Sequence, residues 1–178
     1  MISFNSTERA PPAEGELIPA ARELGLGVMP WSALKSGALS GKYTRENAGK
    51  QKADRGAPVQ AALGENAYAI IDELIRIGKE VGATPAGVAL AWVRGRPGVA
   101  STLIGARSIE QLEQNLDALS VDLTAAQVQR LDALSAPQLG FVAATQSFTP
   151  SMMHGGLTVN GEAPAPSPYA RKPDSPQF

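Results

Sequence analysis

Apolar residues follow two different patterns along the first 136 residues of the chain. Residues 26–31 form a short, continuously apolar run between Gly25 and Ser32, and residues 99–104 form a second apolar segment. Runs of this length and composition are typical of strands buried on both faces of a parallel sheet. A shorter apolar segment lies at residues 2–4. We therefore predict strands at 26–31 and 99–104.

Elsewhere apolar residues recur every three or four positions, which predicts amphipathic helices. The positions that define these helices are Leu17, Ile18, Ala21 and Leu24; Ile70, Ile71, Leu74, Ile77 and Val81; Leu112, Leu116 and Leu119; and Val128, Leu131 and Leu134. Helix boundaries carry their own signals. They are Gly25 as a left-handed C-terminal cap, Thr84 with Pro85 at the start of a helix that runs to about Arg94, and capping boxes at Ser108–Gln111 and Thr124–Gln127.

The alternation of strands and helices predicts an α/β protein with a parallel sheet and right-handed crossovers. The pattern is compatible with an open sheet and with part of a barrel. Residues 33–64 lack sustained periodicity, so we expect a long loop with at most one short helical turn. Residues 137–178 are rich in Pro, Gly and Ser, which predicts a tail that wraps over a surface or is partly disordered. The predicted domain therefore covers residues 1–136.

Composition excludes several kinds of site. The 178 residues carry a net charge of −1, which offers no electrostatic footprint for nucleic acid or an anionic membrane. The absence of cysteine excludes a disulfide framework, a thiolate zinc site and a cysteine nucleophile, and a single histidine, His154, excludes a His-rich metal cluster. No run approaches the roughly 20 apolar residues of a membrane span, and no signal-peptide pattern is present. We expect a cytoplasmic protein.

Two loops with unusual composition follow the predicted strands. Ligands of parallel α/β proteins bind at the carboxyl ends of the strands. Residues 32–42 combine glycines, serines and lysines, which would let backbone N–H groups and side chains approach an oxyanion, although a solvated surface loop has the same composition. Residues 105–108 lead into a helix N-terminus, where Arg107 would grip a phosphate. Two such loops indicate a ligand with separated phosphates.

The helix after Arg107 has two distinct faces. Ser108, Gln111 and Asn115 lie on one stripe of that helix, while its leucines lie on another. Gln111 has two interpretations, since it would either close the capping box with Ser108 or contact a ligand. A polar stripe beside an anion-binding loop would read an adenine and its ribose.

Both loops resemble the cofactor-binding segments of aldo-keto reductases. Residues 29–34, with Gly37, Leu39 and 41–43, resemble the seventh strand and following loop, where Ala33 replaces the usual proline. Residues 103–107, with Gln111, Leu112 and Asn115, resemble the eighth strand and the segment that reads the adenosine 2′-phosphate end of NADP(H). Residues 4–9 resemble the end of the sixth strand.

The resemblance implies a set of NADP(H)-binding residues. The pyrophosphate would be held by Ser32, Leu34, Gly37, Leu39, Gly41 and Lys42. Arg107 and Ser108 would bind the 2′-phosphate, and Gln111 and Asn115 would contact the adenine. Ile104 and Gly105 belong to the same cofactor-binding segment. Phe4 would stack on the nicotinamide, where the family usually has Tyr.

The resemblance also implies a fold, which is the C-terminal portion of a (β/α)8 TIM barrel, about strands 6 to 8 with their helices. The family's catalytic Asp, Tyr, Lys and His come from earlier strands, so we expect an incomplete barrel that contains the cofactor-binding half and no catalytic residue. Its partners would be a nicotinamide dinucleotide and the missing half, or a second copy through exposed strand edges. The alternatives are a non-catalytic nucleotide-binding or interaction protein and an inactive truncated gene product.

Overall fold

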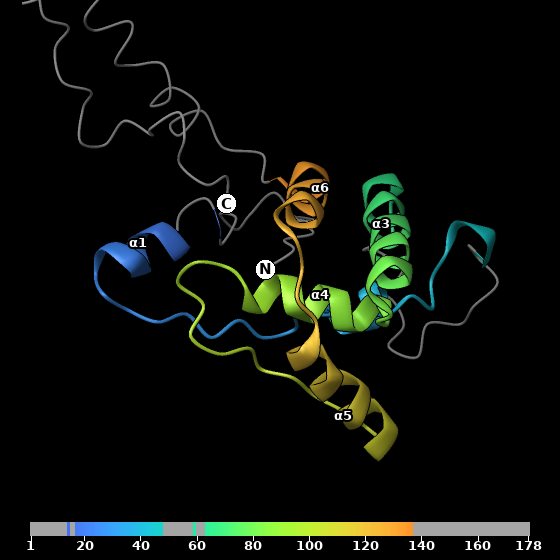
Figure 1. The fold of residues 1–178 in the computed structure, drawn as a ribbon. Coiled ribbons are helices and arrows are strands. Elements are labelled where there is room, and N and C mark those ends of the chain that lie inside the picture. Colours follow the sequence, from blue (N-terminus) through green and yellow to red (C-terminus); the bar gives the residue numbers. More distant parts are fainter. Residues whose placement is uncertain (1–13, 15–16, 48–58, 60–62, 137–178) are drawn as a thin grey trace, which may run out of the picture. The chain divides into compact units, whose positions relative to one another are not determined.

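A computed structural model describes residue 14, residues 17–47, residue 59 and residues 63–136 (Figure 1). The predicted segment at 2–4 and the predicted tail lie outside these residues. The helices of the described part are α1 (Ile18–Glu23), η2 (Lys35–Ser40), η3 (Arg45–Asn47), α3 (Glu65–Val81), α4 (Pro85–Arg94), α5 (Ile109–Leu116), η4 (Asp117–Ser120) and α6 (Ala125–Ser135). None of these helices has the length and apolar character needed to cross a membrane.

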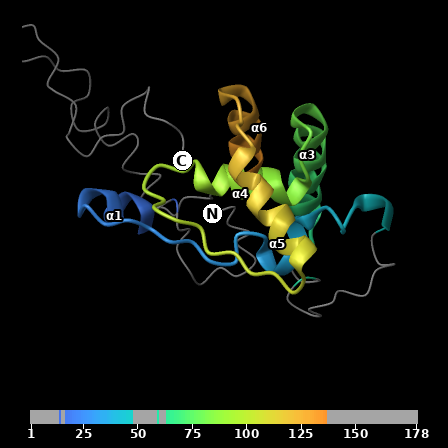
Figure 2. The same cartoon turned by 60° about the horizontal axis from the view of Figure 1, so that its bottom comes forward.

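The core is built where α3, α4 and α6 meet. Figures 1 and 2 show α3 and α6 side by side, with α4 passing close to both. The predicted apolar stripe of α3 faces inward, and α4 is apolar on nearly all sides, as expected of a helix surrounded by protein. The fully buried side chains of this core include Ile71, Leu74, Ile77, Val88, Val93 and Leu131.

Local signals set the ends of these helices as predicted. The Thr84 side chain accepts a hydrogen bond from the Gly87 N–H at 3.0 Å and caps α4. Thr124 and Gln127 form both bonds of the predicted capping box at the start of α6. Gly25 adopts a left-handed φ of 67° directly after the C-cap of α1. These boundaries are confirmed because they depend on contacts within a single turn.

The predicted strands are only partly formed in the described residues. Val28 and Val99 make one isolated parallel bridge, with hydrogen bonds Val28 N–H to Gly98 O and Ala100 N–H to Val28 O, each 2.9 Å long. The two extended segments run alongside each other in Figures 1 and 2.

The prediction that these segments are buried on both faces is wrong for this structure. Met29 is 61% exposed, Trp31 73% and Leu103 52%. Apolar strands of this kind are buried by neighbouring strands and covering helices. Within the described residues each segment pairs only with the other.

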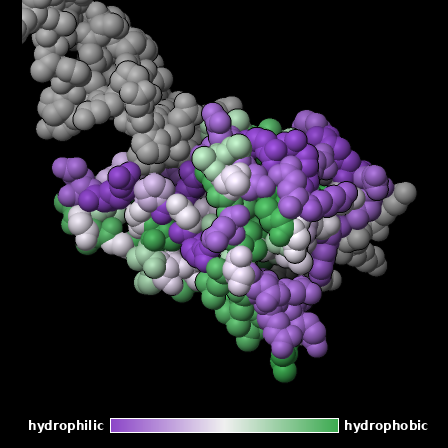
Figure 3. All heavy atoms as spheres, viewed as in Figure 1, coloured by the Kyte–Doolittle hydropathy of each residue, from purple (hydrophilic) through white to green (hydrophobic). Residues whose placement is uncertain are grey.

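The leucine face of α5 is also exposed, whereas its spacing suggested a packed face. Ile109 and Leu119 of this segment are more than half exposed, and Leu112 and Leu116 are more than 40% exposed. The apolar surface along α5 is visible in Figure 3. The buried residue of α5 is instead Asn115, on the polar stripe. The helix therefore turns its polar stripe toward the rest of the domain.

Candidate functional site

A cavity of about 560 Å³ lies where the two predicted anion-binding loops meet. Its walls come from the segment that contains η2, the N-terminus of α4, the second extended segment and the polar stripe of α5. The residues that line it are Trp31, Ser32, Ala33, Leu34, Ser36, Gly37, Ser40, Lys42, Tyr43, Thr84, Pro85, Ala86, Leu90, Leu103, Ile104, Gly105, Arg107, Gln111, Gln114 and Asn115. The juxtaposition of the two loops, which the sequence predicted from strand ends, is thus present.

The first loop is a tightly wound segment with unusual backbone angles. Ser32, Lys35 and Ser36 all have φ values between 48° and 58°, a region that non-glycine residues rarely adopt. The backbone N–H groups of Gly37 and Leu39 both donate to the carbonyl oxygen of Leu34, at 2.9 and 3.2 Å. These N–H groups, which were expected to face an oxyanion, are used within the segment itself. The segment offers side chains to the cavity instead.

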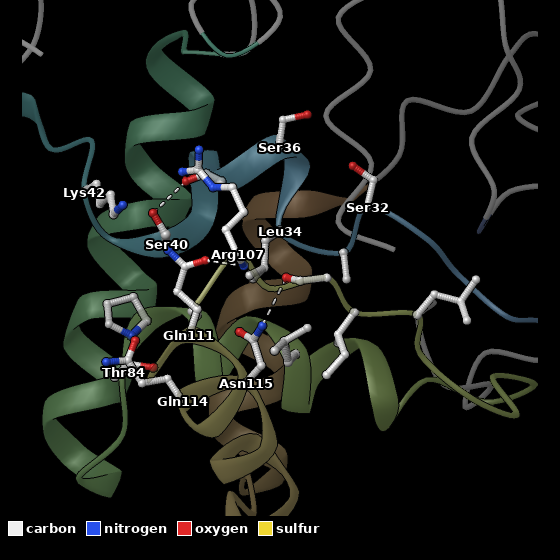
Figure 4. A pocket seen from close by; sticks show the side chains of 18 of the residues that line it. Ser32, Leu34, Ser36, Ser40, Lys42, Thr84, Arg107, Gln111, Gln114 and Asn115 are labelled. Carbon is white, nitrogen blue, oxygen red and sulfur yellow. Dashed lines mark hydrogen bonds between the residues drawn. The ribbon is translucent and has the colours of Figure 1, made fainter. Parts of the chain in front are cut away.

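Those side chains are hydroxyls and a cation. Figure 4 shows Arg107 pointing toward the part of the loop that carries Ser40 and Lys42, whereas the Ser36 hydroxyl points away from them. The Ser40 hydroxyl donates to the Gly37 carbonyl at 2.7 Å, which fixes its orientation at the cavity wall. Two cationic side chains, Arg107 and Lys42, therefore lie on one side of a cavity whose lining also includes serine hydroxyls. Such a set of donors suits phosphate oxygens.

The second loop is held in place by the polar stripe of α5. The Arg107 N–H donates to the side-chain oxygen of Gln111 at 3.0 Å, and the Asn115 side chain donates to the Gly105 carbonyl at 3.4 Å. The predicted capping box is therefore formed only in part. Ser108 accepts from the Gln111 N–H at 3.3 Å, but Gln111 bonds to Arg107 and not back to Ser108.

Three of the predicted site residues do not line the cavity. Leu39 is fully buried in the core beneath it. Gly41 has a left-handed φ of 81° and lies against Pro85. The Ser108 hydroxyl donates to Glu110 and holds the pKa of that carboxyl below its usual value. These residues shape the walls, while Phe4 lies outside the described residues.

Sequence reasoning missed several cavity residues. The sequence indicated Tyr43 only as part of the segment that resembles the loop after the seventh strand; it is 7% exposed and packs in a second small core with Ala38 and Val59. Thr84 was recognised only as a helix cap, and Gln114 only as part of α5. Gln114 lies at i+3 from Gln111, so helical spacing was the signal that would have found it. Among the described residues no group of three acidic or histidine side chains is arranged to hold a metal ion.

Comparison with known proteins places these observations in a family context. The model of the aldo/keto reductase family matches residues 2–136. An uncharacterized oxidoreductase of Bacillus subtilis is 41% identical over 111 residues, which cover 62% of this chain and 32% of the relative. A putative aryl-alcohol dehydrogenase of Saccharomyces cerevisiae is 32% identical over 133 residues, which cover 72% of this chain and 35% of the relative. A putative voltage-gated potassium channel β subunit of Schizosaccharomyces pombe is 31% identical over 145 residues, which cover 77% of this chain and 39% of the relative.

The matched region spans about a third of the length of these curated relatives. The family implies a (β/α)8 barrel. Of the elements expected in such a barrel, the described part of this chain shows helices and one parallel β-bridge. The match confirms the resemblance found in the two loops.

Proposed function

Because the chain belongs to the aldo/keto reductase family, we propose that its cavity binds NADP(H) and that the chain supplies the cofactor-binding portion of a reductase. The reaction class is hydride transfer between a nicotinamide and an aldehyde or ketone. Members of the family generally use a nicotinamide cofactor. The observation that carries the proposal is that Lys42 and Arg107, far apart in the sequence, line the same cavity.

The residues around the cavity fit a dinucleotide. Its volume of about 560 Å³ lies in the range of roughly 300–1,000 Å³ that is usual for ligand clefts. Cationic and hydroxyl donors at one side suit phosphates, and the amides of Gln111, Gln114 and Asn115 suit the hydrogen-bonding edge of a base. When bound, the nicotinamide would supply or accept the hydride. The residues of this chain would bind and orient the dinucleotide.

Arg107 is the residue proposed to distinguish NADP(H) from NAD(H). Its planar guanidinium pairs with two oxygens of a phosphate at once, and only NADP(H) carries the additional 2′-phosphate. Lys42, Ser32 and Ser36 would hold the pyrophosphate. Stacking of the nicotinamide on Phe4 is part of the proposal on the strength of the family resemblance alone.

We also propose that the catalytic Asp, Tyr, Lys and His come from the barrel portion that corresponds to the unmatched two thirds of the relatives. That portion would pack on exposed apolar residues outside the cavity, among them Met29 and the leucines of α5. Exposed apolar surface of this kind is a common feature of interaction sites. Self-association through the same surface is the competing outcome.

A non-catalytic nucleotide-binding protein is the second candidate function. It is favoured by one observation, which is that described residues of this chain line a cavity of about 560 Å³. A binding module would retain cofactor affinity and show no turnover. A reductase portion would gain carbonyl reduction when the complementary barrel portion of a related reductase is added.

The test is a fluorescence titration of the purified chain with NADPH and with NADH, combined with size-exclusion chromatography. Saturable NADPH binding that weakens in Arg107→Ala supports the proposal, and Arg76→Ala on α3, outside the cavity, is the matched control. Absence of NADPH binding by a soluble monomer would exclude the binding-module function. The remaining function would then be a reductase portion that requires the complementary barrel portion.

A further inference from the structure

Arg45, at the start of η3, makes polar contacts with α3. Its Nε donates to Asp72 Oδ2 and its Nη1 to Glu65 Oε2, each at 2.8 Å. The guanidinium carbon lies 5.7 Å from the centre of the Tyr68 ring, a distance at which a cation is attracted to the ring face. Arg45 therefore touches three residues of α3.

The three contacts of Arg45 lie along one stripe of the helix. Glu65, Tyr68 and Asp72 are spaced at i, i+3 and i+7, so they face the same direction over the first two turns of α3. Arg45 holds the pKa of Glu65 below its usual value through their hydrogen bond and its positive charge. The pKa of Arg45 is itself raised by the hydrogen bonds to Glu65 and Asp72. The contact between Arg45 and α3 is therefore electrostatic, and its hydrogen bonds require a defined orientation of the guanidinium.

Asn47 connects this attachment to the cavity. Its side-chain oxygen accepts from the Thr44 N–H at 2.8 Å, and its side-chain amide donates to the Lys42 carbonyl at 2.8 Å. Arg45 and Asn47 are the two ends of η3. A displacement of η3 from α3 would consequently be transmitted to the backbone of Lys42.

Lys42 is also held through its two neighbours in the chain, Gly41 and Tyr43. Gly41 lies against Pro85, and Tyr43 is buried with Ala38 and Val59. The position of the Lys42 backbone, from which its side chain enters the cavity wall, thus depends on two packing contacts and on the η3 attachment. Of these, only the η3 attachment is made by charged, partly exposed side chains.

We propose that Arg45 is a positioning residue for the cofactor: by binding Glu65, Tyr68 and Asp72 it keeps Lys42 in the cavity wall, where it meets a phosphate of the dinucleotide. This inference rests on the proposed NADP(H) site. It assigns a role in affinity to a residue that does not itself line the cavity.

The experiment compares Arg45→Gln with Arg130→Gln. Arg130 is a matched control, because it also joins two acidic residues of α3, Glu73 and Glu80, but lies on α6 and does not line the cavity. NADPH dissociation constants and thermal midpoints are measured for both. We expect Arg45→Gln to weaken NADPH binding by roughly three- to tenfold, the effect of one lost net interaction, while Arg130→Gln leaves the constant within about twofold.

A double-mutant cycle separates positioning from general destabilisation. If Arg45 acts through Lys42, then Arg45→Gln adds little to the loss already caused by Lys42→Met, and Arg45→Lys restores part of the affinity. Asp72→Asn serves as a milder variant that reduces the same attachment. Wild-type affinity in Arg45→Gln, or fully additive losses in the cycle, would overturn the inference while leaving the NADP(H) site intact. Absence of NADPH binding by the wild-type chain would overturn both.

Discussion

The side-chain oxygen of Gln111 accepts a hydrogen bond from the Arg107 backbone N–H across 3.0 Å, so a residue of α5 fixes the loop that precedes it. Asn115, one turn further along, instead donates from its side-chain amide to the Gly105 carbonyl at 3.4 Å. The polar stripe of α5 therefore has a structural task on one side of the loop and borders the cavity on the other. Both tasks use side-chain amides, which donate and accept at once.

Replacing Gln111 tests this arrangement. Gln111→Leu keeps most of the side-chain volume but removes the acceptor for Arg107, and we expect NADPH affinity to fall by roughly three- to tenfold, as for the loss of one net hydrogen bond. Thr124→Ala is the control, because it removes the N-cap of α6, at a cost of about 1 kcal/mol, without removing a cavity side chain. Equal affinities for wild type and Gln111→Leu would contradict the expectation.

Helix ends were predictable from the sequence because their causes are local. Thr84 with Pro85, Thr124 with Gln127 and Gly25 each act within one turn, and each is found where the sequence placed it. The meeting of the two loops was also predictable, from the rule that parallel strands present their carboxyl ends at one edge. That rule requires only the order of the elements.

Burial was harder to predict because it depends on distant neighbours. The run that contains Met29 and Trp31 is apolar enough for a buried strand, yet both side chains are largely exposed. The burial of this run depends on tertiary contacts with segments distant in the sequence, which a local pattern does not describe. The same limit explains Tyr43 and Thr84, whose place beside the cavity follows from tertiary packing and not from a motif.

A buried ion pair between Arg96, two residues beyond the end of α4, and Asp132 of α6 provides a stability prediction. Asp132 accepts from the Trp92 indole N–H at 2.8 Å and from both terminal nitrogens of Arg96, which also lies over the Trp92 ring. Burial raises the pKa of Asp132, and the nearby Arg96 opposes that rise. Asp132→Ala would leave a guanidinium that is only 5% exposed without this partner.

We expect Asp132→Ala to lower the free energy of unfolding by about 3 kcal/mol, the lower part of the range for a broken buried pair, because the Asp132 side chain is 12% exposed. Urea unfolding measures the loss. The double variant Arg96→Met with Asp132→Leu should recover only part of it, because apolar residues of similar size replace both charges of the pair while the buried Glu14 carboxylate loses the attraction of Arg96. A double variant less stable than Asp132→Ala alone would contradict this explanation.

Glu80 provides a pH prediction. Hydrogen bonds from Arg130 and Gln127 hold its pKa below the usual 4.5. The carboxylate is therefore stabilised in the folded state, and its contribution is fully present above about pH 5 and is lost as the pH falls through the lowered pKa. In Glu80→Gln the thermal midpoint should be slightly lower at neutral pH and should decline less between pH 5 and 3. Glu113→Gln, on the exposed side of α5, should reproduce the wild-type profile.

Alanine substitutions at two glycines of residues 32–42 distinguish the cost of backbone strain from the cost of steric crowding. Gly37 and Gly41 both have left-handed φ values, of 98° and 81°, but a Cβ at Gly37 would meet nothing within 4 Å, whereas a Cβ at Gly41 would lie 2.8 Å from Pro85 Cγ. Each alanine substitution carries the conformational cost, roughly 1–3 kcal/mol for strained backbone. Only Gly41→Ala also forces the loop away from α4.

We therefore expect Gly41→Ala to be the less stable variant and the one that loses NADPH affinity, because the movement it requires displaces the adjacent Lys42. Gly37→Ala should lower the thermal midpoint with a smaller change in affinity. Unfolding curves and NADPH titrations of the two variants, run in parallel, measure both effects. Equal losses of affinity would indicate that backbone conformation alone, and not the contact with Pro85, sets the position of Lys42 in the cavity wall.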